Sequence, residues 1–502
     1  MLITILVYLA AMVGIGAVLA KQNQTTDDFY LGGRTLGPLV TAMSAEASDM
    51  SSWLLMGLPG VAYLSGTADA AWTAIGLAIG TYVNWLVVAK RLRNYTHVCG
   101  NSTTLPLFFS NRYRDNKRIL SVIAALLIII FFVPYTASGF AACGKLFANL
   151  FGMDYLPAML ISAIVIVAYT TLGGFLAAST TDFVQSIVMT IAIVVVFGFG
   201  ISKVGSFSAV MDNAKSMAGY FSLTHTHDVA TGTASPYSLL QIFSTLAWGL
   251  GYFGMPHVLL RFMAIGDANK LKLSRRVATV WVVISMAVSV FIGVIGNAMT
   301  KASVLPTLKD PETIILVVSD LISKHGVLAT IIAGLILAGI LAATMSTADS
   351  QLLAASSSAS QNILKEVFMK DMSEKTGMLI ARITVLVIAL IGVFIARNPD
   401  SSVFQIVSFA WAGFGASFGP LVLLALFWKR STFQGALCGM VSGGVMVFVW
   451  KFLIRPMGGA LGIYELLPAF LLGLAVNVIV SLLTPAPSRE VQDEFDKVAS
   501  MK

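Results

Sequence analysis

Residues 44–57 read SAEASDMSSWLLMG, and they lie inside a stretch long enough to cross a lipid bilayer. The segment carries two carboxylates, Glu46 and Asp49, and four serines, but it has no basic residue. A charge at membrane depth costs several kcal/mol unless something pairs with it. Serines and Gly57 hold a regular apolar helix poorly, so a local break there would free backbone carbonyls. Carbonyls, hydroxyls and a nearby acid are the ligands that a hard cation prefers, so the segment predicts an ion site within the membrane.

The composition of the 502-residue chain indicates an integral membrane protein. Hydrophobic residues make up 57% of it and charged residues 11%, whereas a soluble domain carries roughly 25% charge. Apolar segments follow one another without a hydrophilic domain between them, so we expect one membrane domain. The three cysteines, Cys99, Cys143 and Cys438, show no metal-ligand spacing. The net charge of +8 could indicate a nucleic-acid partner, but the basic residues fall in short loops and favour membrane lipid instead.

Thirteen membrane spans are predicted when roughly 17–25 apolar residues are assigned to each helix. They cover residues 2–19, 37–62, 69–89, 119–148, 156–174, 179–202, 238–257, 276–300, 326–356, 377–396, 402–427, 433–453 and 463–484. If the N-terminus lies outside and the C-terminus inside, 23 of the 32 Lys and Arg residues fall in inside loops, as the positive-inside rule requires. The first span has no basic region before it, so we expect a retained helix. These features predict a multi-pass protein of the plasma (cytoplasmic) membrane.

A second interrupted span lies at residues 247–256, which read AWGLGYFGMP. Three glycines and a proline predict a weak or broken helix there. Trp248, Tyr252 and Pro256 recur every four residues and would share one face of a helix. Two interrupted spans that are five spans apart fit a pair of inverted five-helix repeats. The predicted division is an extra helix and inside loop at 1–36, the first repeat at 37–202, an outside loop at 203–237, the second repeat at 238–427, two extra helices at 428–484 and a cytoplasmic tail at 485–502.

A third polar cluster lies at residues 342–351, which read AATMSTADSQ. Ser346, Asp349 and Ser350 are spaced so that they share one helix face. Such a face must turn toward protein, water or an ion when its helix crosses lipid. Asp182 could join Asp349 and Ser350 in a second cation or proton site, or it could simply cap a helix.

Six segments resemble the sodium:solute symporter family, and most closely its sodium/proline branch. They are LGGRTLGP at 31–38, SDMSSWLLMGLPG at 48–60, TLGGFLAASTTDFVQ at 171–185, WGLGYFGMPHVLLRFM at 248–263, MSTADSQLL at 345–353 and WAGFGASFGP at 411–420. The resemblance covers nearly the whole chain. It implies an all-α, LeuT-like fold of two inverted five-helix repeats with about 13 transmembrane helices. It also implies secondary active transport that is coupled to sodium and works by alternating access.

The resemblance further implies residue roles. Sodium would be held by the backbone carbonyls of Ala47, Met50 and Ala343 and by the hydroxyls of Ser346 and Thr347. Asp49 would lie near the ion or support the broken helix. The path of L-proline would be lined by Ser51, Trp53, Gly57, Tyr135, Trp248, Tyr252 and Pro256. Aromatic walls suit the proline ring, and a broken helix offers N–H groups to the carboxylate. Trp248 and Tyr252 could instead be ordinary core or interfacial anchors.

Three residues depart from the pattern of the sodium/proline branch. Glu46 and Ser52 stand in place of glycine, and Asp349 stands in place of serine. The two extra acids lie near the implied ion path, so they leave the number of coupled cations open. Glu46 and Asp349 would either help to bind a second cation or carry a proton.

The sequence favours a sodium-coupled importer of L-proline over other classes of protein. The runner-up is a sodium- or proton-coupled symporter of another small amino or organic acid. A channel would need a continuous polar lining, whereas the polar residues here cluster at mid-span. A transporter-like membrane sensor would need a signalling module, and the tail after Pro485 is short for one. No nucleophile–base pair or metal motif such as HExxH is visible, so we do not expect an enzyme, and nothing indicates an obligate protein partner.

Overall fold

The computed structural model describes residues 1–21, 25–368, 373–398 and 402–501. Helices make up most of this part of the chain. The elements up to residue 216 are α1 (Leu2–Ala20), α2 (Thr26–Leu31), η1 (Gly32–Arg34), α3 (Pro38–Ser52), η2 (Trp53–Gly57), α4 (Leu58–Ser65), α5 (Thr67–Val83), η3 (Asn84–Val88), α6 (Ala89–Val98), α7 (Leu105–Arg112), α8 (Ile119–Phe151), α9 (Tyr155–Val204) and α10 (Phe207–Ser216).

The second half of the chain begins with a short antiparallel hairpin, in which His225 pairs with Pro236 and His227 with Ala234. Its elements are β1 (His225–His227), β2 (Ala234–Pro236), α11 (Leu239–Leu246), η4 (Ala247–Gly254), α12 (Pro256–Ala264), η5 (Ala268–Lys270), α13 (Leu271–Lys301), η6 (Pro311–Thr313), α14 (Ile314–Ser323), α15 (Val327–Ser357), η7 (Ser358–Phe368), α16 (Glu374–Ile395), α17 (Val403–Phe427), α18 (Phe433–Val449), η8 (Trp450–Ile454), η9 (Arg455–Met457), η10 (Gly459–Leu461), α19 (Leu466–Leu483) and α20 (Arg489–Ser500).

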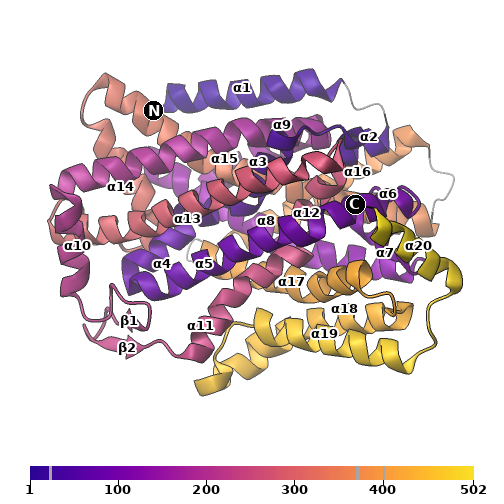
Figure 1. Ribbon diagram of the computed structural model, residues 1–502. Helices are drawn as coiled ribbons and strands as arrows, with labels where there is room; N and C mark the ends of the chain where they lie inside the picture. The colour runs from indigo at the N-terminus through magenta and orange to yellow at the C-terminus, as the bar shows by residue number, and fades with distance from the viewer. Residues whose placement is uncertain (22–24, 369–372, 399–401, 502) are drawn as a thin grey trace.

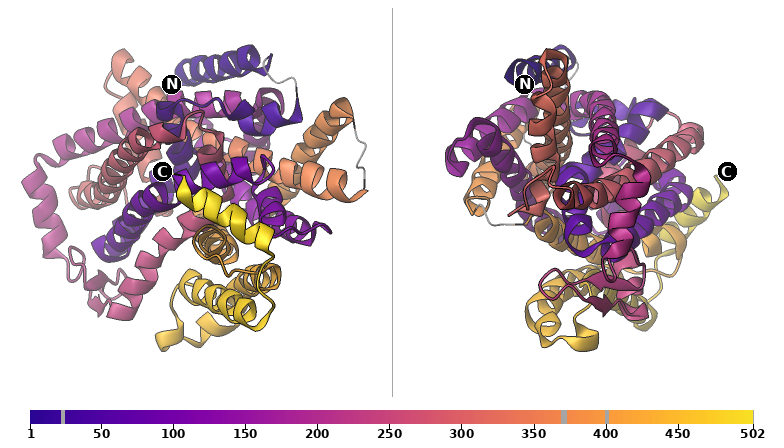
Figure 2. Two further views of the ribbon diagram at one scale, coloured as in Figure 1. Left: turned by 45° about the vertical axis from the view of Figure 1, so that its right-hand side comes forward. Right: turned by 90° about the vertical axis from the view of Figure 1, so that its left-hand side faces the viewer.

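The long helices form one bundle, and the short elements gather at its two ends (Figure 1). One end carries α10 and the hairpin β1–β2, and the other carries α2, α7 and α20. Within the bundle, α15 packs against α9, α3 and α8, and α17 packs against η4. The α18–α19 pair lies at the edge opposite α1 in both views of Figure 2. The buried core is therefore built around α3, α8, α15 and α17, where the polar clusters of the sequence also lie.

Ten helices in the described part of the chain are long and apolar enough to cross a membrane. They correspond to all the predicted spans except 37–62, 156–174 and 238–257. The span 156–174 appears as a shorter apolar helix, and Gly174, with φ 63° and ψ −177°, bends the chain after it. The other two are the interrupted segments. The multi-pass character of the protein is confirmed, and the count of thirteen spans stays a prediction.

Both predicted interruptions are present. The first replaces a straight helix by α3, the π-helical turn η2 and α4, and Ser51 at the end of α3 has φ 44°. The second replaces it by α11, the tighter turns of η4 and α12, which Pro256 begins. Proline suits the first helical position because its missing N–H has no helical partner there. The serine-rich and glycine-rich compositions therefore act as the sequence predicted.

Glycines allow η4 to approach α5 at backbone distance. A Cβ atom added at Gly80 would lie 2.4 Å from the carbonyl oxygen of Gly249, and one added at Gly249 would lie 2.2 Å from that of Gly76. No real Cβ contact is that short, so only glycine fits this crossing. The glycines of the second interruption therefore permit close packing as well as a break in the helix.

Candidate functional site

The break in α3 exposes carbonyl groups that side chains of other helices contact. The hydroxyl of Ser346 on α15 donates to the carbonyl of Ala47 at 2.9 Å, and the hydroxyl of Tyr135 on α8 donates to that of Asp49 at 3.0 Å. Ser51, at the break itself, accepts from the backbone N–H of Trp53 through its own side chain at 3.1 Å. A non-glycine residue at positive φ costs about 1–3 kcal/mol, so this break is strained.

Most of the residues that the sequence predicts as sodium ligands lie together in the structure. Ser346 Oγ also lies 3.2 Å from the carbonyl oxygen of Ala343, and Thr347 Oγ1 lies 3.1 Å from the same oxygen. With the carbonyl of Ala47, these atoms form a buried set of carbonyl and hydroxyl oxygens between α3 and α15. The carbonyl of Met50 accepts from the N–H of Trp53, one turn farther along. Neutral oxygens of this kind suit a small hard cation.

No cluster of three or more His, Cys, Asp or Glu side chains that could hold a metal occurs among the described residues. The oxygen set between α3 and α15 is therefore unlike a transition-metal site, which draws on thiolate and imidazole ligands. Its chemistry fits a small alkali cation.

Asp49 links the two interrupted helices. Its Oδ2 accepts from the hydroxyl of Tyr252 on η4 at 2.6 Å, and in the described structure Oδ1 is buried without a hydrogen-bond partner. The side chain of Asp49 is 5% exposed. A buried carboxylate with one free oxygen is costly unless a cation approaches it. The bond to Tyr252 fits a supporting role and the unpartnered Oδ1 fits a place near the ion, so both predicted roles of Asp49 stay predictions.

An aromatic pocket lies beside Asp49. The rings of Trp53 and Trp248 are 5.5 Å apart between centroids, and those of Trp248 and Trp411 are 6.2 Å apart. The cavity between them measures only about 10 Å³ and is lined by Asp49, Met50, Trp53, Leu77, Tyr135, Trp248, Met286, Val407 and Trp411. A space of this size holds about one water molecule at most, far less than an amino acid needs. The pocket is closed by its own side chains here, so a substrate can enter only if the aromatic rings move.

Trp411 is a pocket residue that the sequence did not single out. Its indole N–H donates to the carbonyl of Trp248 at 2.8 Å, and its ring meets that of Tyr252 edge-on at 5.1 Å. The ring fits because residue 251 is a glycine. A Cβ atom there would lie 1.9 Å from the indole nitrogen of Trp411. The segment WAGFGASFGP was already notable as a motif, but the contact joins residues 163 positions apart, which no local pattern reveals.

Four predicted substrate residues lie outside the lining of this pocket. Tyr252 does not line the pocket but contacts two residues that do, Asp49 through a hydrogen bond and Trp411 through an edge-on ring contact. Ser51 faces a neighbouring small cavity with Tyr135 and Thr347, and Gly57 lines a separate cavity of about 420 Å³ beside Lys145 and Glu312. Pro256 starts α12 and lies past the interruption. The structure therefore brings Trp53, Tyr135 and Trp248 together as one pocket.

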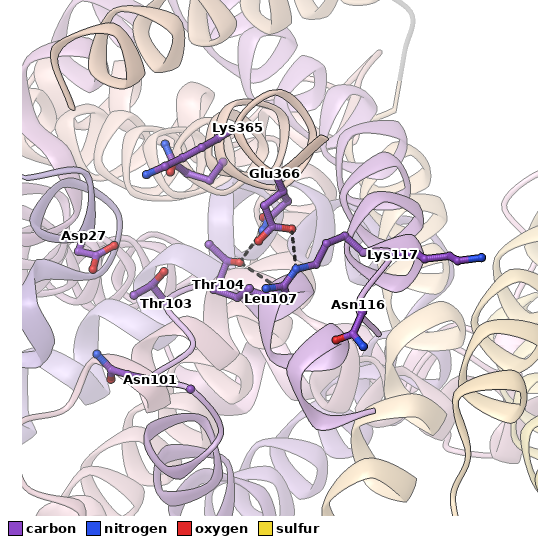
Figure 3. A pocket seen from close by; sticks show the side chains of 13 residues that line it. Asp27, Asn101, Thr103, Thr104, Leu107, Asn116, Lys117, Lys365 and Glu366 are labelled. Carbon is purple, nitrogen blue, oxygen red and sulfur yellow. Dashed lines mark hydrogen bonds and ion pairs between the residues drawn. The ribbon is translucent and has the colours of Figure 1, made fainter. Parts of the chain in front are cut away.

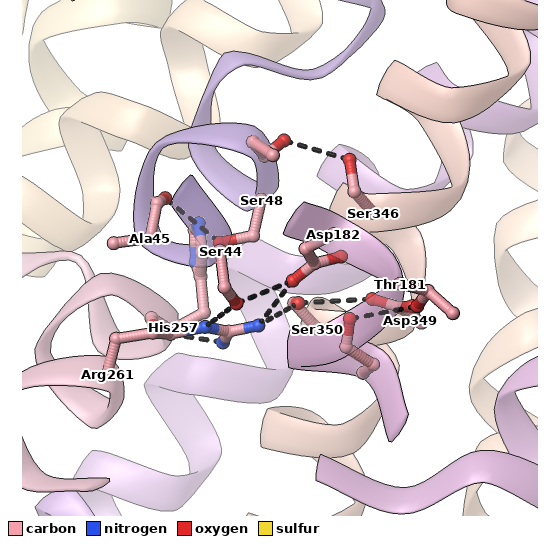
Figure 4. Close-up of polar contacts among 12 residues, drawn as sticks. Ser44, Ala45, Ser48, Thr181, Asp182, His257, Arg261, Ser346, Asp349 and Ser350 are labelled. Atoms are coloured by element: carbon pink, nitrogen blue, oxygen red, sulfur yellow. Dashed lines mark hydrogen bonds and ion pairs between the residues drawn. The ribbon is translucent and has the colours of Figure 1, made fainter. Parts of the chain in front are cut away.

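The second predicted ion cluster has a built-in cation (Figure 4). Asp182 on α9 pairs with Arg261 on α12 at 3.2 Å, and both side chains are no more than 1% exposed. Arg261 also donates to Ser44 at 3.0 Å and to Ser350 at 2.5 Å. Ser350 in turn donates to Asp349 at 3.1 Å. The predicted association of Asp182, Asp349 and Ser350 is thus present, with Arg261 at its centre.

Arg261 corrects two expectations from the sequence. The 23 basic residues counted in the predicted inside loops include Arg261, yet its side chain is buried in α12, because α12 is only nine residues long and its last turns still lie in the bundle. Asp182 does not cap a helix either, since α9 continues through it to Val204. A basic residue inside the bundle changes the charge balance, because two acids now share one cation.

Glu46 is separate from this cluster. Its Oε1 accepts from the indole N–H of Trp85 at 2.8 Å, and Oε2 has no hydrogen-bond partner in the described part of the chain. The hydrogen bond joins α3 to η3. The ring of Trp85 also packs on Phe262 of α12, with 4.4 Å between the ring centroids. Among the described residues, no hydrogen bond or ion pair therefore connects Glu46 to Asp182 or Asp349, with which the sequence grouped it.

The Arg34 side chain connects segments of the chain at the α2 end of the bundle. Arg34, just before α3, donates to the carbonyls of Met263 at 2.6 Å and Ser102 at 2.8 Å. Burial, with help from the nearby charge of Arg93, lowers the pKa of Arg34 to about 10, so it stays protonated at neutral pH. The guanidinium therefore joins α12 to the loop after α6 as a permanent charge.

A polar cavity of about 890 Å³ opens at the same end (Figure 3). Asp27, Asn101 and Thr103 lie on one side of it and Glu366 on the other. Asn362 on η7 spans to the N-cap residue of α7, Thr104, at 3.0 Å. The sequence did not predict this cavity, because its wall comes from four separate segments.

An all-helical bundle whose two interrupted helices meet over a buried acid is the architecture of a secondary transporter. Residues 29–443 match the sodium:solute symporter family. The chain belongs to that family, and sodium is its coupling ion.

Relatives and solved structures agree with this assignment. The chain is 41% identical to the sodium/proline symporter of Salmonella typhimurium, over 99% of its own length and 96% of the relative's. It is 40% identical to the osmoregulated proline transporter OpuE of Bacillus subtilis, over 97% and 96% of the two chains. Its fold is similar to that of a Na⁺-coupled sialic acid symporter in an outward-open state, with a TM-score of 0.78, 18% identity and coverage of 97% and 98%. The nucleobase-cation-symport-1 transporter Mhp1 shares the fold more loosely, with a TM-score of 0.55, 13% identity and coverage of 94% and 98%.

Proposed function

We propose that the protein imports L-proline together with sodium by alternating access. The observation that carries the proposal is the aromatic pocket of Trp53, Trp248 and Trp411, which adjoins the broken helix α3 and its oxygen set. Flat apolar walls suit a compact ring, and the N–H groups freed at the break suit a carboxylate. The near-full-length identity to sodium/proline symporters supports the same substrate.

Sodium binds between α3 and α15, where the carbonyls of Ala47 and Ala343 and the hydroxyls of Ser346 and Thr347 lie together. In this structure the hydroxyls donate hydrogen bonds to the carbonyls. A cation that is coordinated by these oxygens would also fix the position of α3 against α15. The ordered break then completes the pocket, and proline binds more tightly. By linkage, proline tightens sodium binding by the same factor.

The cluster of Asp182, Asp349 and Ser350 is a second site for a cation or a proton in this proposal. Arg261 compensates only one of the two acids, and the remaining negative charge supports binding of a second cation or a proton. Glu46 acts separately, through its contact with Trp85. The protein lies in the cytoplasmic membrane with its N-terminus outside, and the five-helix repeats at 37–202 and 238–427 supply the moving parts. The excess of basic residues in the inside loops supports this orientation.

The test is uptake of labelled L-proline into proteoliposomes with an inward sodium gradient, compared with an equal potassium gradient. Excess alanine, glycine, acetate or pantothenate is added in parallel. We expect uptake that requires sodium and that unlabelled proline alone abolishes. Uptake that follows a proton gradient would mean that protons, and not sodium, are the coupling ion. Inhibition by one of the competitors would mean that the substrate is another small amino or organic acid. A lack of proline uptake under both gradients would refute the proposal.

A further inference from the structure

Trp248 is a shared wall of two cavities. The closed pocket around Asp49 lies on one side of it. An outer cavity of about 330 Å³ lies on the other, and its lining includes Trp248, Phe404, Tyr464 and Thr226 of the hairpin end. The position of this one indole therefore affects how far the inner pocket is open to the outer cavity.

Several rings contact Trp248, and Tyr464 is the most nearly parallel to it. The two rings are 5.1 Å apart between centroids, with 23° between their planes. Trp53 and Phe404 lie 5.5 Å and 5.6 Å away at steeper angles of 34° and 49°. Offset stacking is a favourable arrangement for aromatic rings. The backbone of Trp248 in η4 is fixed by close packing on α5 and by the hydrogen bond from Trp411, so the neighbouring rings decide where its indole lies.

Tyr464 is fixed independently of Trp248. Its backbone N–H donates to Ser244 Oγ at 2.8 Å, and its hydroxyl donates to the carbonyl of Ser408 on α17 at 2.6 Å. The next residue, Glu465, is fully buried and pairs with Arg455 at 2.8 Å. The tyrosine ring is thus attached at both ends and at its neighbour, so it can act as a rigid support.

We propose that Tyr464 is a positioning residue of the substrate path, which holds the Trp248 indole in place between the two cavities. The inference rests on the proposed function, since it takes Trp248 as part of the proline pocket. Tyr464 lies in the segment between α18 and α19, beyond residue 443 where the family match ends. The extra C-terminal helices of this chain thereby take part in substrate entry.

The first test compares Tyr464→Leu with Tyr464→Phe in sodium-driven proline uptake. Leucine removes the stacked ring, whereas phenylalanine keeps it and loses only the hydroxyl. When the indole is unsupported, fewer molecules have a formed pocket, so the apparent affinity falls by that fraction. We expect KM for proline to rise roughly two- to tenfold in Tyr464→Leu with kcat within about twofold, and Tyr464→Phe to stay near the wild type. Tyr82→Leu, at a half-exposed tyrosine of α5, is the matched control.

An unchanged KM in Tyr464→Leu would overturn the proposal, and so would an equal effect of leucine and phenylalanine, because the ring would then not matter. Uptake is expressed per amount of folded protein, so a lower yield of Tyr464→Leu does not alter its KM.

A second test does not depend on proline. Val407 lines the inner pocket, so Val407→Cys in a Cys438→Ser background reports how far that pocket is open. We expect a membrane-impermeant maleimide added outside to label this cysteine roughly two- to tenfold faster when Tyr464→Leu is also present. An unchanged labelling rate would overturn the role of Tyr464. If the wild type fails to transport proline but the labelling rate rises, the proposed substrate is wrong and the positioning role stands.

Discussion

Replacing Arg261 by glutamine should destabilise the protein more than replacing its partner Asp182 by asparagine. The reason is the local charge balance. Arg261 is paired directly with Asp182 at 3.2 Å and reaches Asp349 through Ser350. Removing the arginine leaves two buried acids without a cation, whereas removing Asp182 leaves one acid and one cation.

The expected magnitudes follow from burial. Breaking a buried ion pair by removal of one partner costs about 3–5 kcal/mol when an uncompensated charge remains, which describes Arg261→Gln. Asp182→Asn loses a charge-assisted hydrogen bond worth about 1.5–3 kcal/mol, and Asp349 still faces the arginine through Ser350. Arg261→Gln combined with Asp182→Asn has one uncompensated acid, so it should fall between the two single variants. Adding Asp349→Asn to this pair should recover further stability.

The assay is the thermal midpoint of detergent-purified protein, recorded at one scan rate for all variants, because large membrane proteins unfold irreversibly. Asp320→Asn is the matched control. Its carboxylate is 58% exposed and pairs with Lys324, and an exposed pair contributes little. If Arg261→Gln is no less stable than Asp182→Asn, or if Asp182→Asn does not rescue it, the acids are not charged as the reasoning requires, and the argument fails.

Three further predictions concern ion binding, packing and the buried Glu46. Ser346→Ala with Thr347→Ala should raise the sodium concentration for half-maximal uptake about tenfold, while Ser357→Ala, whose hydroxyl bonds Ala354 within its own helix, should leave it unchanged. Gly80→Ala should cost about 1–3 kcal/mol or more in stability because its Cβ would meet Gly249, and Gly14→Ala, with nothing within 4 Å, should be neutral in the same thermal scan. Trp85→Phe should cost about 1.5–3 kcal/mol in the native chain and much less when Glu46→Gly is also present; an equal cost in both backgrounds would contradict the bond between the two side chains.

The two interruptions could be predicted from the sequence because their causes are local. Serines in an apolar span, or three glycines and a proline within ten residues, weaken a helix wherever it packs. The partners that stabilise the interruptions could not be predicted this way. Trp411 reaches Trp248 across 163 positions, and Arg261 reaches Asp182 across 79. Such contacts depend on how helices pack, and a single sequence carries no periodic signal for them.

Arg261 shows how this gap leads to an error. Near the end of an apolar segment, an arginine looks the same whether it anchors a span in the cytoplasm or enters the bundle. The deciding fact is the short α12, which ends at Ala264 after η4 has shortened the span before it. An acid at membrane depth, such as Asp182, was the available hint, since its cheapest partner is a basic residue from another helix. The sequence analysis instead gave Asp182 either a second cation or proton site or the cap of a helix.

The two interruptions differ in how easily they can change, and this difference suggests where coupling begins. The gap in η4 is filled by the Trp411 ring and by backbone contact with α5, so it is fixed by packing. The break in α3 is held by the hydroxyls of Ser346 and Tyr135, and each such bond contributes about 0.5–1.5 kcal/mol. The strain at Ser51, about 1–3 kcal/mol, opposes them on a similar scale. A sodium ion that enters across 100 mV supplies roughly 2.3 kcal/mol, which is enough to shift a balance this close. Sodium is therefore expected to act on α3 first, and the aromatic pocket, which shares Asp49 and Tyr135 with that break, follows it.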